Sequence, residues 1–195
     1  MARPRAFDEG EVLDAALRCF WERGYEATSV RDLAASMGLT GASLYNAFGD
    51  KHALYERALA RYVSGSVGER IQRLETAGLP PRAAIAGFFG EVVERSLDDP
   101  QMKGCMVVNA AVELGPHDPE IREAAAATLG EIEAFLRRQV ATGQADGSLS
   151  ARQSPDDAAR MLLGVLLGLR VLARIRPDRA LLEGAFRTAL AALDA

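Results

Sequence analysis

Cysteine, histidine and β-branched residues are scarce in this sequence of 195 residues. Two cysteines and two histidines, scattered along the chain, are too few for a disulfide framework and cannot build a structural zinc site. Val and Ile number 12 and 5, whereas Ala and Leu number 35 and 24, and this shortage of β-branched residues disfavours β-sheet. We therefore expect an all-α protein that binds no metal.

Long hydrophobic runs are also missing. The most apolar stretch, residues 161–169, covers nine residues, well short of the roughly 20 that span a bilayer. We expect no membrane segment, and because no basic-then-apolar leader opens the chain we expect a cytoplasmic protein. The formal net charge is −4, so the molecule as a whole does not attract a polyanion, and any nucleic-acid site has to be local.

The sequence also lacks the patterns that accompany catalysis. It contains no phosphate-binding loop, no paired-carboxylate pattern and no metal-ligand spacing, and its two histidines are His52 and His117. We expect a protein that is not an enzyme and that carries no cofactor.

Three helices are predicted near the N-terminus, after a short basic arm at residues 1–7. Asp8 begins the first helix, and Gly24 is placed to end it in a left-handed conformation. Two shorter helices follow at about 29–37 and 40–48, each opened by a capping residue. Two short capped helices packed on a longer one have the dimensions of a helix-turn-helix.

The second short helix has the composition of a recognition helix. A small residue at its entrance lets the backbone approach phosphates, and short polar side chains on its exposed face reach base edges in the major groove. Asn46 can bond an adenine edge in bidentate fashion, while Ser43 and Tyr45 can reach phosphate or base. Lys51, at the start of the next helix, places a cation and backbone amides against phosphate, as Thr28 can do at the preceding helix. The arginines of the basic arm are expected in the neighbouring minor groove. The expected DNA contacts are Arg3, Arg5, Thr28, Thr40, Gly41, Ser43, Tyr45, Asn46 and Lys51.

Four stretches of this region carry a family resemblance. They are ATSVRDLA at 27–34, MGLT at 37–40, ASLYNAF at 42–48 and DK at 50–51. In residues and in spacing they resemble the TetR family of bacterial transcriptional regulators, over residues 7–62 or about a third of the chain. The resemblance implies a helix-turn-helix DNA-binding domain at 1–60 and an effector-binding and dimerisation domain at 61–195, with about nine helices in all.

The match departs from the family at two positions that matter for DNA binding. Gly41 stands where members often carry Lys or Arg, and Asn46 stands where they often carry His. One phosphate-binding cation is therefore missing. Residues 1–62 hold eight basic and nine acidic residues, so we expect modest non-specific affinity that depends steeply on salt.

The rest of the chain is predicted to be helical. A helix from Lys51 is expected to continue past Val63, although Gly65 and Gly68 weaken it. Further helices are predicted at about 81–97, 105–114, 119–143, 155–175 and 178–193. Prolines start three of them, at 81, 119 and 155, and glycines at 115 and 143 end two.

The last two of these helices are expected to form a homodimer interface. Residues 161–169 are apolar on nearly every side of a helix, and Gly164 and Gly168 permit close backbone approach. With the final helix they can build a four-helix bundle across a two-fold axis. The alternative is that both helices simply close the core of a monomer.

An effector pocket is expected between the helices of this second region. Its candidate residues are Phe88, Phe89, Cys105, Met106, Asn109 and Phe135. None is charged, which favours a small effector that is largely apolar or electrophilic. Each of them could equally be an ordinary core residue.

Cys105 is a candidate thiol switch. It follows Lys103 and Gly104 at the start of a helix, where the dipole and a nearby ammonium favour the reactive thiolate. The stretch KGCMVVN at 103–109 also resembles a branch of the family whose repressors sense electrophiles and oxidants through a cysteine in this position. The alternative is a small buried hydrophobe that begins a core helix.

Together these features predict a ligand-responsive transcriptional regulator. We expect a repressor that binds a pseudo-palindromic double-stranded operator as a homodimer and is released by a small-molecule, electrophilic or oxidant effector. The alternative is a helical protein–protein interaction module that does not bind DNA.

Overall fold

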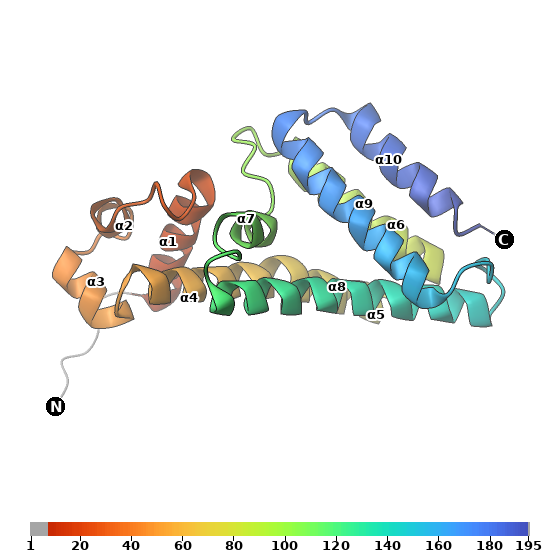
Figure 1. The fold of residues 1–195 in the computed structure, drawn as a ribbon, viewed down its shortest axis with the longest axis horizontal. Helices are drawn as coiled ribbons and strands as arrows, with labels where there is room; N and C mark the ends of the chain where they lie inside the picture. Colours follow the sequence, from red (N-terminus) through yellow and green to blue (C-terminus); the bar gives the residue numbers. More distant parts are fainter. Residues whose placement is uncertain (1–7, 195) are drawn as a thin grey trace. The chain divides into compact units, whose positions relative to one another are not determined.

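The described residues, 8–194, fold entirely into helices and connecting turns, as Figure 1 shows. In the computed structural model this part of the chain contains ten α-helices and one π-helical segment, and it contains no strand. The predicted all-α class is therefore confirmed. The chain divides into two compact units, of which the first ends at Gly65 and the second begins at Ser66.

The first unit consists of four helices with short connections. Their bounds are α1 Glu9–Arg23, α2 Val30–Ser36, α3 Gly41–Phe48 and α4 Lys51–Val63. Each begins at a residue whose side chain accepts a hydrogen bond from a first-turn amide, which satisfies donors that a helix start otherwise leaves open. These capping residues are Asp8, Ser29, Thr40 and Asp50.

Local sequence also sets the two helix ends that shape the helix-turn-helix. Gly24 and Gly38 have φ of 83° and 64°, a backbone region that costs other residues energy, so both glycines end helices as predicted. The core below is apolar and aromatic: Leu33 and Leu44 are fully buried, and Phe20 packs edge-on against Tyr55 at 5.0 Å between ring centres. The helix-turn-helix thus rests on α1 and α4.

The i, i+3, i+4, i+7 spacing of Leu13, Ala16, Leu17 and Phe20 predicts that these residues form the buried face of α1, and the structure differs in part. Leu13 and Leu17 are only half-buried, whereas Val12 and Cys19 join Ala16 and Phe20 in the core. The stripe keeps its helical period and is rotated by about one residue, because the partners of α1 decide which side of a broadly apolar helix faces inward.

The second unit contains the remaining helices. They are α5 Glu69–Thr76, α6 Pro81–Leu97, α7 Met106–Glu113, α8 Pro119–Ala145, α9 Pro155–Ile175 and α10 Arg179–Ala191, and they are preceded by η1 Ser64–Gly68, which spans the boundary between the two units. The long helix predicted to run on from Lys51 is instead divided into α4, α5 and the π-helical η1 between them, at the two glycines that were expected to weaken it.

The second unit is a layered helical bundle. Helix α9 packs on α8, α6 and α10, and α6 also contacts α8 and α10 (Figure 1). Aromatic rings fill the middle: Phe88 and Phe135 lie 5.5 Å apart between ring centres, and Phe89 stacks on Phe186 at 4.3 Å. No helix in the described part of the chain has the length and apolar character needed to cross a membrane.

Candidate nucleic-acid interface and effector cavity

Helix α3 separates a buried face from a polar exposed face. Leu44 and Phe48 are buried, whereas Tyr45 is 52% exposed and Asn46 is also exposed. The four-residue spacing of the two buried residues turns the polar residues away from the core. Both Tyr45 and Asn46 therefore stand where a recognition helix presents side chains to a groove.

The entrance of α3 is held by its own cap. Thr40 Oγ1 accepts a hydrogen bond from the Ser43 amide at 3.1 Å and lies 2.9 Å from Ser43 Oγ. Among the described residues, and apart from its chain neighbours and the backbone of α3 itself, no atom lies within 4 Å of the position that a Cβ would take on Gly41. The first turn is thus open for close approach, and a Cβ at this position would meet open space among the described residues.

Lys51 is the first residue of α4 and packs on an aromatic ring. Its Nζ lies 4.1 Å from the centre of the Tyr25 ring, a cation–π geometry that limits where the ammonium can go. Asp50, the cap before it, accepts a hydrogen bond from the Ala53 amide at 2.8 Å. The predicted cation is therefore present at a helix N-terminus, where backbone amides also favour an anion.

Thr28 does not fulfil its predicted role. Its side chain is completely buried, and its hydroxyl donates to the Gly24 carbonyl at 2.6 Å. The hydroxyl cannot reach a phosphate because it is used to close the turn after α1, and Ser29 caps α2 in its place. Arg3 and Arg5, the predicted minor-groove arginines, lie outside the described residues.

Ion pairs already hold several basic side chains of the first unit. Arg57 pairs with Glu9 and Arg61 with Asp14, both between α4 and α1. The hydrogen bond from Arg61 to Asp14 holds the pKa of that carboxyl below its ordinary value of 3.8. These arginines bind the unit together, which reduces the charge that remains for DNA.

Arg31 is an exposed cation that the sequence analysis did not select. It is the second residue of α2, and within the described chain no ion pair involves it. Acidic residues are usual in the first turn of a helix, so a basic residue there is a sequence feature that marks Arg31 as a candidate anion-binding residue. Arg31 and Lys51 therefore both stand near helix starts with charge to offer a phosphate.

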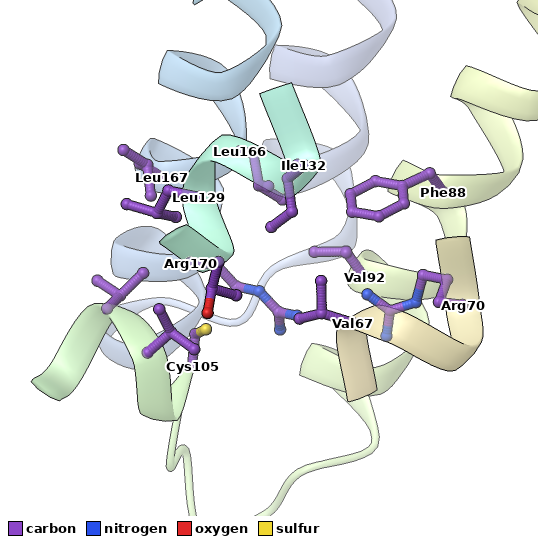
Figure 2. Close-up of a pocket in the computed structure, with 13 residues that line it drawn as sticks. Val67, Arg70, Phe88, Val92, Cys105, Leu129, Ile132, Leu166, Leu167 and Arg170 are labelled. Atoms are coloured by element: carbon purple, nitrogen blue, oxygen red, sulfur yellow. The ribbon is translucent and has the colours of Figure 1, made fainter. Parts of the chain in front are cut away.

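The second unit contains a small cavity with apolar walls, drawn in Figure 2. Its volume is about 20 Å³, which is room for a single water-sized group. Its lining residues come from η1, α5, α6, α8 and α9 and from α7 with the residue before it: Val67, Arg70, Phe88, Val92, Cys105, Val107, Val108, Thr128, Leu129, Ile132, Leu166, Leu167 and Arg170.

Of the six predicted pocket residues, the structure brings Phe88 and Cys105 to the cavity. The other four are placed elsewhere: Phe89, Met106 and Phe135 are buried in the packed core, and Asn109 is used in hydrogen bonds. Its amide donates to the Lys103 carbonyl at 2.9 Å, and its oxygen accepts from Arg174 at 2.8 Å. These bonds brace the segment before α7.

The expectation of a pocket without charge needs correction, because Arg70 and Arg170 line the cavity. Arg70 is 2% exposed, lies 5.4 Å from the centre of the Phe88 ring, and donates from Nε to Glu91 at 3.2 Å. The burial of Arg70 could be predicted from its position in the sequence. It lies three residues after Val67 and four before Leu74, so it shares their inward face. A basic residue inside an apolar stripe is a reason to expect a buried site.

Cys105 occupies the N-cap position of α7, and its side chain makes no capping hydrogen bond. It is 9% exposed and is not in a disulfide. The Lys103 ammonium, expected to favour its thiolate, instead lies 2.7 Å from Asp99 and 2.9 Å from Gln101. Burial alone would raise the pKa of Asp99, but the hydrogen bonds from Lys103 lower it below 3.8. Cys105 thus shares the cavity with Arg170, and its neighbouring lysine already has a carboxylate.

One face of α9 is apolar and exposed. Val171 and Ile175 are 52% and 74% exposed, and Gly164 and Gly168 lie on the same side one and two turns earlier. Outside the backbone of α9 and the adjacent residues, no atom of the described chain lies within 4 Å of the position that a Cβ would take on either glycine. This face is able to accept another helix at close range.

Two parts of the chain match two family models. Residues 12–58 match the model for bacterial regulatory proteins of the tetR family, and residues 81–189 match the model for a tetracyclin repressor-like C-terminal domain. Over its full 195 residues the chain is 31% identical to the whole of YezE, an uncharacterized HTH-type transcriptional regulator of Bacillus subtilis (strain 168).

Two further proteins are similar over most of the chain. The HTH-type transcriptional repressor ComR of Escherichia coli (strain K12) is 27% identical over 172 residues, which are 88% of this chain and 82% of ComR. A solved structure of a cysteine mutant of the TetR family transcriptional regulator CifR, complexed with 26-bp double-strand operator DNA, is 36% identical with a TM-score of 0.85. That match covers 98% of this chain and 100% of the CifR chain.

Proposed function

The chain belongs to the TetR family of bacterial regulatory proteins, and from this premise we propose that it is a repressor that binds a pseudo-palindromic operator as a homodimer. In this proposal residues 1–60 read DNA, and residues 61–195 hold a small effector and the dimer interface. Effector binding releases the operator. Like its family, the protein acts by regulation and not by catalysis.

The exposed face of α3 is the observation that carries this proposal. It holds Tyr45 and Asn46 clear of the core, beside an entrance that Gly41 leaves open. An exposed asparagine can make two hydrogen bonds to adenine in the major groove, and its loss costs about 1–3 kcal/mol of discrimination. The solved complex of the similar protein CifR with double-strand operator DNA supports a DNA-binding role for this chain.

The test is a titration of the full chain onto DNA from its own upstream region, with excess competitor DNA. Asn46→Ala should weaken specific binding roughly 5- to 150-fold and relax preference at one base pair of each half-site. Gln72→Ala is the matched control, because it removes an exposed amide from α5 in the second unit. Equal specific binding by the parent and the Asn46→Ala protein would reject Asn46 as a base-reading residue. Absence of specific binding by the parent, also after a genomic selection for operators, would favour the alternative interaction module.

Dimerisation is proposed through α9 and α10. The exposed apolar face of α9, with its two open glycines, supports contact with the same face of a second copy. Gly168→Arg places a long charged side chain on this face, at a position where a Cβ meets no described atom within 4 Å outside the backbone of its own helix and the adjacent residues. It should yield a monomer by light scattering and abolish high-affinity operator binding, since one protomer then reads one half-site. A dimeric Gly168→Arg protein would place the interface elsewhere.

The effector is proposed to act in the cavity, as a ligand or by modifying Cys105. Val67 in η1 lines this cavity, and η1 directly follows α4 in the chain. A ligand that displaces Val67 therefore acts on the segment that continues the helix after the recognition unit. A shift in populations between two arrangements of that segment would change the distance between the α3 helices of the two protomers, each of which reads one half-site.

Two cysteine variants separate these routes. If modification of Cys105 releases DNA, N-ethylmaleimide or diamide should release the operator from the parent and from Cys19→Ala, but not from Cys105→Ser. Cys19 is the matched control, because it is also buried but lies in α1. Release from Cys105→Ser as readily as from the parent would reject a thiol switch at Cys105. Operator binding by the parent that neither reagent changes would leave a non-covalent ligand as the effector.

A further inference from the structure

The cavity of the second unit is positively charged. Arg70, Cys105 and Arg170 are its titratable lining residues, and none of the residues that line it is acidic. The guanidinium groups of Arg70 and Arg170 both enter the space between the apolar side chains, as Figure 2 shows. Removing a charge from water is costly unless an opposite charge replaces the water.

The two arginines are balanced differently. Arg70 donates to Glu91 at 3.2 Å, but Arg73 also donates to both oxygens of that carboxylate, at 2.7 and 2.8 Å. The single negative charge of Glu91 is therefore shared by two arginines. The hydrogen bonds from Arg73, followed by the charge of Arg70, keep the pKa of Glu91 below its ordinary value of 4.5, so this carboxylate is ionised at neutral pH.

Arg170 has capacity for a further partner. Its one hydrogen bond in the described structure runs from Nη1 to Ser96 Oγ, and at 3.5 Å it is long and leads to a neutral group. None of the ion pairs formed by the described residues includes Arg170. A planar guanidinium offers two parallel donors, which match the two oxygens of a carboxylate.

From these contacts we propose that the effector is a small monocarboxylate with an apolar body, held by Arg170. Arg70 adds a positive charge from the other side of the cavity but stays bound to Glu91. The apolar body lies against the leucine, isoleucine and valine side chains that form most of the wall. A phosphate is disfavoured, because its second charge would have no further arginine to meet it.

The size of the cavity requires that binding open it. About 20 Å³ accommodates a group the size of water, so a body of several carbons has to displace wall side chains such as Val67. Binding then selects an opened form of the bundle. The inference rests on the proposed function, because it names the effector class of that same site.

The experiment measures acid binding by calorimetry on the full chain, using butyrate, hexanoate and octanoate with the matched neutral amides. We expect at least one acid to bind and its amide to bind much more weakly. Arg170→Gln should weaken acid binding roughly 10- to 100-fold, since a hydrogen-bonded charge is lost, and Arg170→Lys should recover part of it. Arg160→Gln is the matched control, an exposed arginine on the same helix that does not line the cavity.

A second readout covers the case in which Arg170→Gln does not fold, as judged by circular dichroism. Bound acid should slow alkylation of Cys105 by iodoacetamide in the parent protein, because both groups line one cavity. Failure of every acid to bind, or equal binding of acid and amide, would overturn the inference. Operator binding is titrated separately without acid, so the proposed function can fail or stand independently of this result.

Discussion

Both units contain an arginine that pairs with a carboxylate of another helix, but one arginine is exposed and the other is buried. In the first unit Arg61 lies at the surface, bound to Asp14 at 2.5 Å, and it ties α4 to α1. In the second unit Arg70 also pairs with a carboxylate of another helix, but it is 2% exposed and lines a cavity. Solvent screens the first charge, whereas the second depends on the groups around it. The contribution of an ion pair to stability therefore depends on how far its charges are buried.

A second difference concerns the relation between site and core. On α3 they lie on opposite faces, with Leu44 inside and Asn46 outside. Around the cavity they coincide, since Phe88 is at once a core residue and a wall of the site. Mutations should therefore separate stability from binding in the first unit and should fail to separate them in the second.

The largest effect is expected from Phe88→Ala. Phe88 is 1% exposed and contacts the rings of Phe89 and Phe135, so its truncation should cost about 3–5 kcal/mol of the free energy of unfolding. Urea denaturation measures this loss, and effector binding should change with it. Asn46→Ala should cost about 0.5 kcal/mol or less while weakening operator binding. Comparable stability losses in the two variants would contradict the separation of site and core on α3.

Charge removal should distinguish the two ion pairs. Glu91→Gln removes the carboxylate beside the buried Arg70 and should cost about 3 kcal/mol, because a buried charge then loses its partner. Asp14→Asn removes the carboxylate beside the exposed Arg61 and should change stability much less. Equal urea midpoints for the two variants would show that burial does not decide the value of these pairs.

Acid should weaken the second unit through Glu91. The pKa of Glu91 is lowered in the folded protein, chiefly by hydrogen bonds from Arg73. Its contribution to stability is therefore complete above the ordinary value of 4.5 and is lost as the pH falls through the lower folded value. As the pH is lowered below 4.5, the urea midpoint of the parent protein should decrease, and that of Glu91→Gln should decrease less steeply. Parallel curves would contradict the role given to this carboxylate.

The smallest effect is expected from Gly41→Lys, which restores the cation common in the family. The open space at this position accepts the side chain, so stability should hardly change. One added phosphate contact should raise operator affinity and steepen the slope of log affinity against log salt by about 0.9. Gly65→Lys, another glycine with open space but outside α3, is the control. An unchanged slope would mean that the entrance of α3 does not lie against a phosphate.

Local patterns allowed most of the first unit to be predicted. Caps such as Ser29 and Asp50, glycines with positive φ such as Gly38, and the four-residue spacing of Leu44 and Phe48 act within one or two turns of the chain. In the second unit the same signals located α9 at its observed bounds of Pro155–Ile175. Such signals need no knowledge of distant residues.

The tertiary structure alone decided which side chains meet. Thr28 and Arg170 show this in opposite directions. Thr28 was expected to contact a phosphate, but it is buried and its hydroxyl donates to Gly24, whereas Arg170, which directly follows the apolar stretch 161–169, lines the cavity. That cavity collects residues from 67 to 170, and no periodicity along one helix reveals which faces of six segments converge. The amino-acid sequence determined the helices, their ends and the family, because those depend on near neighbours. The buried charge depends on packing between distant segments, and so it required the fold.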